Sequence, residues 1–233
     1  MSKRTKGTCT YCGKTYTKNP MVKHLLSCEA RLQAWTHAGE NQKTAGYFVL
    51  LISGTYRPQY WLIAEIKDSA KLNDLDQFLR DIWLECCGHM SGFKIAGVRY
   101  ESHPEATMGW GIQDKGMTSK LANVIAPGMV FEHEYDYGSA TALTITVLEH
   151  HTGQTKKEKV AVLARNHPVQ YSCDECEKNT AIMICLECAY DGYGFLCDDC
   201  REDHECGEEL LSPLYNSPRS GVCGYEGSVK YPD

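Results

Sequence analysis

Apolar residues in the middle of the chain follow two different periods. Residues 47–53 (YFVLLIS) and 57–67 (RPQYWLIAEIK) are rich in β-branched and aromatic residues on either side of a short turn, which predicts a hairpin. In residues 71–87 the apolar side chains recur every three or four positions, which predicts one long amphipathic helix. Residues 91–100 and 130–151 again favour strands. Strands around one helix predict an α+β fold with a central mixed or antiparallel sheet.

The first thirty residues carry a different pattern, in which two cysteines, a histidine and a third cysteine have the spacing C-x2-C-x11-H-x3-C. Two intervening residues allow one tight turn to direct both thiols at a single ion, and a helix beginning near Asn19 would present the other two ligands one turn apart. The spacing therefore predicts a C2HC zinc finger, with Tyr16 and Met21 as its small core. Its expected ligands are Cys9, Cys12, His24 and Cys28.

Residues 171–206 contain seven of the thirteen cysteines, and this density indicates metal binding. Three C-x2-C pairs are followed by His204-x-Cys206, which gives eight ligands and hence two tetrahedral sites. If the sites interleave, as in cross-braced modules such as RING, B-box and ZZ domains, the first and third pairs share one ion. A sequential arrangement is the alternative, and Cys223 could replace Cys206. The eight expected ligands are Cys173, Cys176, Cys185, Cys188, Cys197, Cys200, His204 and Cys206.

These sites favour zinc over disulfides or iron–sulfur clusters. The cysteine total is odd and the first residues lack the apolar segment of a secretory signal, which argues for a reducing compartment. Iron–sulfur clusters usually use other spacings. We therefore expect three Zn²⁺ ions, each in a closed structural site, in a soluble cytoplasmic protein without a membrane-spanning segment.

Charge is distributed unevenly along the chain. Residues 1–31 carry seven Lys or Arg against one acid, whereas residues 171–233 carry four against fourteen. A basic segment suits nucleic acid and an acidic one does not. The alternatives for the basic segment are a solvated face and a protein-binding finger. The candidate nucleic-acid contacts are Lys3, Arg4, Lys6, Lys14, Lys18 and Lys23.

No pattern in the sequence indicates a catalytic centre. Cys86 falls on the apolar face of the expected helix, so we interpret it as a buried structural thiol and not as a nucleophile. Histidines that are adjacent on a strand, such as His150 and His151, point to opposite faces and do not readily share an ion. Phosphate-binding loops, nucleophile elbows and H-E-x-x-H motifs are not found in the sequence.

The central segments LLISGTYRPQYWLIAEIKDSAKLNDLDQFLRDIW, HMSGFKIAGVRY and KLANVIAPGMVFEHEYDYGSATALTITVLEH resemble the Ri-plasmid (pRiA) open-reading-frame-three family, also described as insertion-element passenger proteins. The similarity covers about residues 47–151. The string CGEELLSPLYNSPRSGVCGYEG also resembles the tail of zinc-bearing members. The predicted domains are a finger (1–31), a linker (32–46), the family-like α+β domain (47–168), and a cysteine-rich binuclear zinc module with its tail (169–233).

The chain matches the motifs of this family only in part. His89 and Phe93 match its His-x-x-x-Phe segment, and Tyr135 to Gly138 match its Tyr-Asp-Phe-Gly run, but Ser139 replaces the usual aspartate. The resemblance implies an α+β fold and no established activity. We therefore expect a zinc-binding recognition protein without catalysis, in which the finger contacts nucleic acid or a partner and the acidic module binds protein. The alternative is an enzyme, or enzyme subunit, of mobile-element origin that uses a groove around the YDYG strand.

Overall fold

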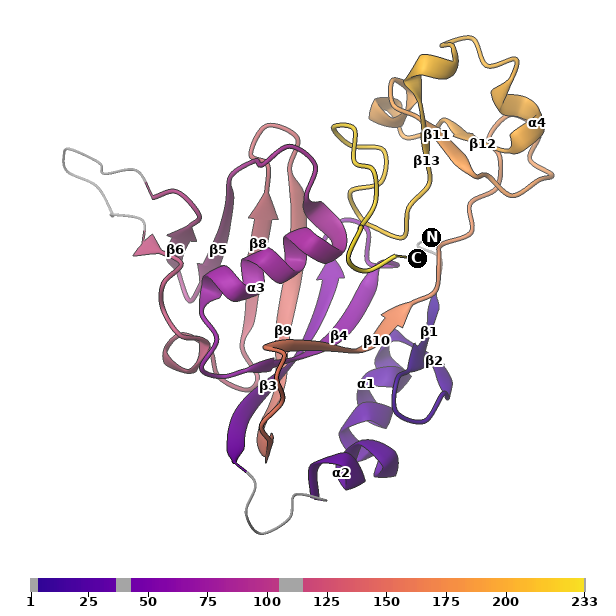
Figure 1. Ribbon diagram of the computed structural model, residues 1–233. Coiled ribbons are helices and arrows are strands. Elements are labelled where there is room, and N and C mark those ends of the chain that lie inside the picture. Colours follow the sequence, from indigo (N-terminus) through magenta and orange to yellow (C-terminus); the bar gives the residue numbers. More distant parts are fainter. Residues whose placement is uncertain (1–3, 37–42, 105–114, 233) are drawn as a thin grey trace. The chain divides into compact units, whose positions relative to one another are not determined.

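The computed structural model describes residues 4–36, 43–104 and 115–232, and the chain divides into two compact units (Figure 1). The first unit comprises Met1–Leu79 and His89–His167. The second comprises Arg80–Gly88 and Pro168–Asp233. Among the described helices, none has the length and apolarity needed to cross a membrane.

The first unit is built on a ten-stranded sheet with the order β2-β1-β10-β4-β3-β9-β8-β5-β6-β7. Neighbouring strands are antiparallel except for β6 and β7, which are parallel, so the sheet is mixed. The strands are β1 Lys6–Cys9, β2 Thr15–Thr17, β3 Thr44–Gly54, β4 Trp61–Lys67, β5 Ser91–Ile95, β6 Val98–Glu101, β7 Lys115–Gly116, β8 Val130–Tyr135, β9 Thr141–Gln154 and β10 Val160–Asn166.

The hydrophobic pattern predicted the central strands correctly. β3 and β4 form the expected hairpin, with Leu50 opposite Ala64. β8 and β9 pair on either side of the YDYG turn, and β8 alternates between exposed and buried residues along its whole length. The α+β fold is thus confirmed, with a large sheet and few helices.

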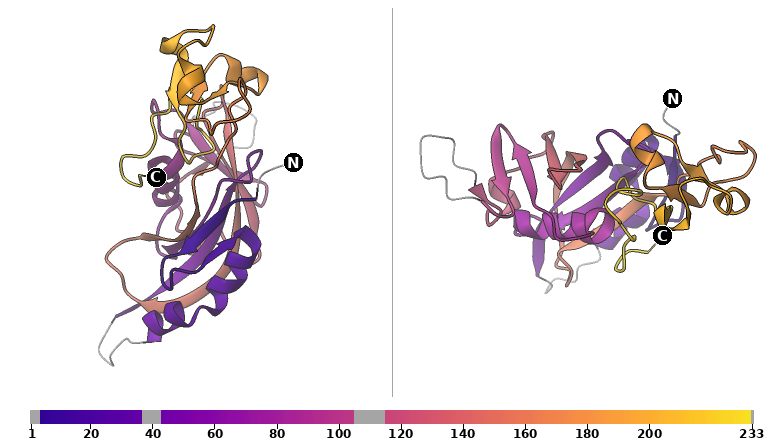
Figure 2. Two further views of the ribbon diagram at one scale, coloured as in Figure 1. Left: turned by 90° about the vertical axis from the view of Figure 1, so that its right-hand side faces the viewer. Right: turned by 90° about the horizontal axis from the view of Figure 1, so that it is seen from above.

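Helices cover both faces of this sheet (Figure 2). α3 (Leu72–Leu79) lies on the face that carries His133, because Asp76 of the helix bonds to that side chain. α1 (Lys18–Ser27) packs Met21 and Leu25 on the other face, against residues that include Trp61 and Ile63. The remaining helical segments of this unit are α2 (Glu29–Thr36) and the 3₁₀ turn Leu121–Asn123.

The finger is continuous with the sheet. β1 pairs antiparallel with β10, placing Gly7 opposite Asn166 and Cys9 opposite Ala164. Cys9 and Cys28, two of the predicted ligands, are buried in the same apolar cluster as Leu163 of β10. The finger therefore extends both the hydrogen-bond ladder and the core of the central sheet.

The second unit contains little regular structure. Its small sheet has the order β12-β11-β13, formed by Phe195–Leu196, Met183–Cys185 and Leu211–Pro213. Its helical segments are the π-helix Arg80–Leu84, the 3₁₀ turns Cys188–Asp191 and Glu208–Leu210, and α4 (Asp198–Arg201). The tail packs beside the π-helix: Trp83 Nε1 donates to the Asn216 carbonyl, and Ser217 Oγ donates to the Trp83 carbonyl.

Candidate metal centres

Four groups of cysteine and histidine side chains could each hold a metal ion. Within each group the ligand atoms lie within 4.8 Å of one another. Three groups match the sequence prediction, and the fourth does not. The groups are Cys9/Cys12/His24/Cys28, Cys173/Cys176/Cys197/Cys200, Cys185/Cys188/His204/Cys206 and Cys86/Cys87/His89/Cys223.

The finger group is formed by the β1–β2 turn and by α1. Gly13 has a φ of +70° and its amide donates to the Cys9 carbonyl, which closes the turn. The Lys14 amide donates to the Cys12 thiol and lowers its pKa. Cys12 Sγ lies 3.1 Å from His24 Nε2, and the Tyr16 ring packs 4.8 Å from the His24 ring. The predicted core residue Met21 is fully buried.

The two groups of the cysteine-rich module interleave along the chain. The first C-x2-C pair lies with the third, and the second lies with His204 and Cys206. Cys206, and not Cys223, shares a group with Cys188. His204 Nδ1 also lies 3.1 Å from a Glu175 carboxylate oxygen, a contact that orients the ring.

Backbone amides favour the thiolate form in this module. The amides of Asn179 and Lys178 lower the pKa of Cys176 to about 6. Burial raises the pKa of Cys185, but hydrogen bonds, first from the Cys188 amide, outweigh it and bring the pKa to about 7. The thiols of Cys188 and Cys185 raise the pKa of Cys206 to about 12, because like charges would crowd together. A bound cation would remove that repulsion.

The donor sets and spacings fit zinc. Tetrahedral geometry with Zn–S bonds of about 2.3 Å places two thiolates about 3.8 Å apart. The Cys176–Cys197 and Cys188–Cys206 sulfur distances are 3.9 and 3.7 Å, and the Cys188 sulfur lies 3.6 Å from His204 Nε2. Residues with Cys₃His or Cys₄ donors in this arrangement would hold Zn²⁺ as closed structural sites, and the ion would contribute folding free energy.

The fourth group was missed in the sequence. Cys86 was expected to be a buried core thiol, but it is half-buried and lies in a group with Cys87, His89 and Cys223. The sequence did contain a C-C-x-H segment and a cysteine, Cys223, that had no predicted role. Cys87 and Cys223 are 136 positions apart, so no motif spacing indicated that they would meet. With this group included, all thirteen cysteines of the chain belong to candidate metal groups.

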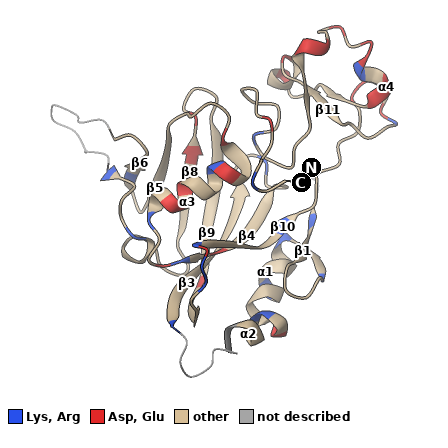
Figure 3. Cartoon of the chain, in the orientation of Figure 1, with Lys and Arg blue, Asp and Glu red and all other residues tan. Residues whose placement is uncertain are grey.

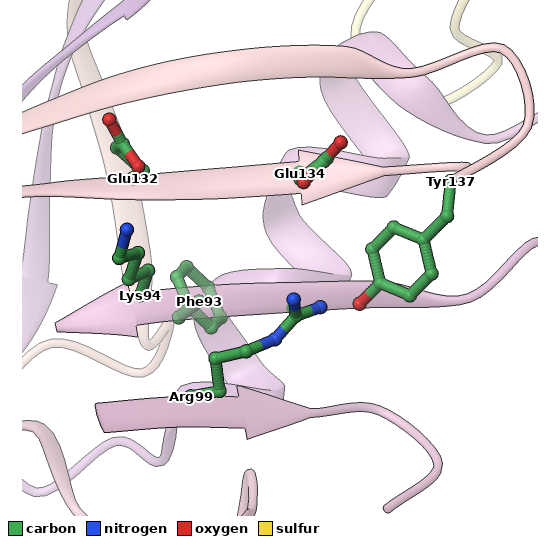
Figure 4. Close-up of a pocket in the computed structure, with 7 residues that line it drawn as sticks. Phe93, Lys94, Arg99, Glu132, Glu134 and Tyr137 are labelled. Atoms are coloured by element: carbon green, nitrogen blue, oxygen red, sulfur yellow. The ribbon is translucent and has the colours of Figure 1, made fainter. Parts of the chain in front are cut away.

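Beside the YDYG strand the sheet forms a small hollow of about 60 Å³ (Figure 4). Tyr137 donates to Glu101, and Arg99 also bonds to Glu101. Burial, followed by the Glu101 carboxylate, raises the pKa of Tyr137, so its hydroxyl stays protonated at neutral pH. A hollow of this size admits a few water molecules rather than an organic substrate.

A larger groove of about 420 Å³ lies beside the first turn of α1. It is lined by Arg4 and Lys18, two of the predicted nucleic-acid contacts, and burial lowers the pKa of Lys18. Lys6, Lys14 and Lys23 are exposed on the finger, while Lys3 lies outside the described residues. The other lining residues are Thr5, Thr17, Asn19, Pro20, Pro58, Gln59 and Trp61.

No family model matches the chain, and no curated protein matches it. One solved structure with similarity is a protein of unknown function, MM3350, from Methanosarcina mazei Go1. It is 13% identical, with a TM-score of 0.39 over 52% of this chain and 67% of that chain.

Proposed function

We propose that this chain is a zinc-binding recognition protein without catalytic activity, whose N-terminal finger region binds nucleic acid. The observation that carries the proposal is the groove beside α1, which is lined by Arg4 and Lys18 and adjoins a finger with further exposed lysines. Phosphate oxygens are the ligands that such a basic, polar groove favours.

The first turn of α1 adds to the electrostatic attraction. Residues 18–20 line the groove, and this turn contains no acidic residue. Pro20 has no amide hydrogen, but the amides of Lys18 and Asn19 lie at the helix N-terminus, where backbone amides carry partial positive charge and favour anions. Arg4, Lys18 and the helix start together would hold one or two phosphates.

The packing of α1 limits which of its side chains can contact nucleic acid. Met21 and Leu25 are buried against the sheet, so only the side of the helix that carries Asn19 and Lys23 is exposed. Because β1 also pairs with β10, the finger cannot turn independently of the sheet. We therefore propose that backbone contacts dominate, with strong salt dependence and weak sequence preference.

Fluorescence anisotropy with labelled duplex and single-stranded oligonucleotides over a range of salt concentrations tests this proposal. We expect the double variant R4E/K18E to weaken binding by about tenfold or more and to reduce the salt slope by about two. The matched control is K115E, on β7 at the opposite end of the strand order, which should bind as the wild type does. Salt-independent binding, or equal loss in K115E, contradicts the proposal.

We further propose that the acidic module binds a basic, amphipathic segment of a partner protein. Tyr190, Tyr193 and Ile182 are 83, 50 and 48% exposed. They belong to residues 171–233, the strongly acidic part of the chain, where acidic segments are coloured red around α4 (Figure 3). Exposed tyrosines bury a large area at low entropic cost when a partner covers them. The surrounding carboxylates select positive charge on that partner.

A synthetic Lys/Leu amphipathic helix peptide is a suitable probe for this surface. We expect the substitution Y190S/Y193S to weaken its binding by at least fivefold, whereas Y56S, which alters the 85% exposed Tyr56 of the first unit, should have no effect. Equal binding by all three proteins contradicts a surface at these tyrosines. We also propose that the central domain, whose residues 47–151 resemble the pRiA open-reading-frame-three family, has a mobile-element origin.

A further inference from the structure

We propose that Cys86, Cys87, His89 and Cys223 form a fourth zinc site, which fastens the C-terminal tail to the end of the long helix. Cys86, Cys87 and Cys223 all belong to the second unit, and His89 stands two residues after Cys87 in the local spacing C-C-x-H. This site goes beyond the three ions that the cysteine spacing predicts, and it is independent of nucleic-acid binding.

The distances between the donor atoms fit a zinc ion. Cys87 Sγ lies 3.7 Å from Cys223 Sγ, close to the edge of about 3.8 Å expected for two thiolates on a tetrahedral zinc ion. A disulfide would require about 2.05 Å. The four donor atoms lie within 4.8 Å of one another, as they do in the other three groups.

The backbone around the cysteines repeats a feature of the finger. Cys12 is followed by a glycine with φ of +70°, and both Cys87 and Cys223 are likewise followed by glycines, with φ of +71° and +62°. Such a left-handed residue turns the chain sharply after the ligand. Cys223 itself has a φ of +50°, which is unfavourable for a residue with a Cβ and is typical of functional positions.

A buried guanidinium lies against the Cys86 thiol. Arg219 is fully buried in the second unit, and its Nη2 donates to Cys86 Sγ at 3.3 Å. Binding of Zn²⁺ to three thiols and a neutral imidazole releases three protons and leaves the site with one negative charge. The Arg219 guanidinium offsets that charge, as an outer-shell partner of a metal ligand does.

The histidine is oriented by the YDYG strand of its own unit. His89 Nε2 lies 3.6 Å from an Asp136 carboxylate oxygen, and its ring packs edge-on to Tyr135. The Asp136 carboxylate also accepts the amides of Gly138 and Ser139, which fixes it in place. A carboxylate at Nε2 leaves Nδ1 for the metal, the arrangement common in zinc sites. The matched residues His89 and Asp136 of the family-like segment would thus act as ligand and positioning residue.

Native mass spectrometry of the full chain, purified in reducing buffer with zinc, tests this site. We expect four zinc ions in the wild type, three in C223S and three in H89A. The control H103A, which removes an exposed histidine, should retain four. C12S should lose a different ion, so that C12S/C223S holds two. Substitution of cobalt provides a second readout, because loss of the site removes a share of the thiolate-to-cobalt absorption in C223S.

Three ions in the wild type with an unchanged count in C223S and H89A would overturn the proposal. So would peptide mapping that finds a Cys87–Cys223 disulfide in the zinc-loaded protein. If C223S does not fold, H89A still decides the question, because it leaves all three thiols in place. D136N addresses the positioning role: we expect it to retain four ions but to lose one to a chelator at least tenfold faster than the wild type does. An unchanged rate would remove Asp136 from the proposal.

Discussion

His133 and Asp76 are joined by a buried hydrogen bond, with 2.7 Å between His133 Nε2 and Asp76 Oδ1, although 57 residues separate them. The same carboxylate oxygen accepts the Ser91 hydroxyl at 2.7 Å. All three side chains are buried, and they come from α3, β5 and β8. Asp76 therefore fastens the helix to the sheet through polar contacts within an otherwise apolar interface.

Substitution of Asp76 by alanine should lower the free energy of unfolding by about 3 kcal/mol. The change leaves the Ser91 hydroxyl and the His133 ring without this acceptor inside the protein, and unsatisfied buried groups cost about 1–3 kcal/mol each. Urea unfolding of the zinc-loaded protein, followed by tryptophan fluorescence, measures the loss. The control E132A removes an exposed carboxylate from the neighbouring position on β8 and should change stability by less than about 0.5 kcal/mol. Equal effects of the two substitutions would contradict an anchoring role.

Glu65 should make stability depend on pH on the acidic side. Its carboxylate is almost fully buried and accepts from Lys156 and from His151 Nε2 at 3.0 Å. Burial would raise the pKa of Glu65, but these two bonds outweigh it and hold the pKa below the ordinary 4.5. A carboxyl with a depressed folded-state pKa stabilises the protein above pH 4.5, and this stabilisation is lost as the pH falls through the folded-state value.

The variant E65Q isolates this contribution from acid protonation of the metal ligands, which affects both proteins equally. We expect the wild type to be the more stable at pH 7 and the stability difference to shrink steadily below pH 4.5. Urea midpoints measured from pH 7 to pH 3 give the comparison. E158Q alters an exposed carboxyl of the same region and should follow the wild-type curve. A difference between wild type and E65Q that does not vary with pH would argue against an ionised Glu65.

Local patterns explain why the central fold was predictable. The runs that became β3 and β4 are short, apolar and joined by a brief turn, so their pairing follows from neighbouring residues. The expected helix is largely correct, although its last turn is π-helical at Arg80–Leu84. The grouping of cysteines and histidines in residues 9–28 and 173–206 was likewise predictable, because a C-x2-C pair constrains its own turn geometry.

Contacts between distant segments were not predictable in the same way. The β1–β10 pairing joins residues more than 150 positions apart. A strand as short as Lys6–Cys9 has no hydrophobic pattern from which its pairing partner could be predicted. Cys223 meets Cys87 only because the buried tail passes the π-helix. The anchoring role of Asp76 was hidden because an acidic residue in a helix pattern is normally read as exposed.

Gly7→Ala should loosen the finger from the sheet. A Cβ at this position would lie 2.3 Å from the Arg165 carbonyl oxygen and 2.7 Å from the Trp61 ring, so backbone or ring must move. Overpacking of this kind costs about 1–3 kcal/mol. We expect faster hydrogen exchange at the amides of β1 and β10 that bond to each other, while the β10–β4 and β1–β2 pairings remain. The matched control is G116A on β7, where a Cβ makes only an ordinary contact at 3.6 Å. Unchanged exchange in β10 would contradict a finger that depends on this pairing.

Removal of one ligand from the cysteine-rich module should expose a diagnostic set of thiols. In the interleaved arrangement Cys176 shares its ion with Cys173, Cys197 and Cys200, so C176S should release the ion and make those three cysteines reactive. Cys185, Cys188 and Cys206 should remain protected, because thiolates bound to zinc react slowly with alkylating reagents. A sequential arrangement predicts instead that Cys185 and Cys188 become reactive while Cys197 and Cys200 stay protected.

Brief alkylation with iodoacetamide, followed by peptide mass mapping, distinguishes the two arrangements. The reciprocal variant C188S should leave Cys173, Cys176, Cys197 and Cys200 protected and expose Cys185 and Cys206. Partial reactivity of the second group in C176S would indicate that the two ions support each other's folding, which the pairing of β11 with β12 favours, since β12 ends beside Cys197. Reactivity of Cys185 and Cys188 in C176S, with Cys197 and Cys200 fully protected, would overturn the interleaved arrangement.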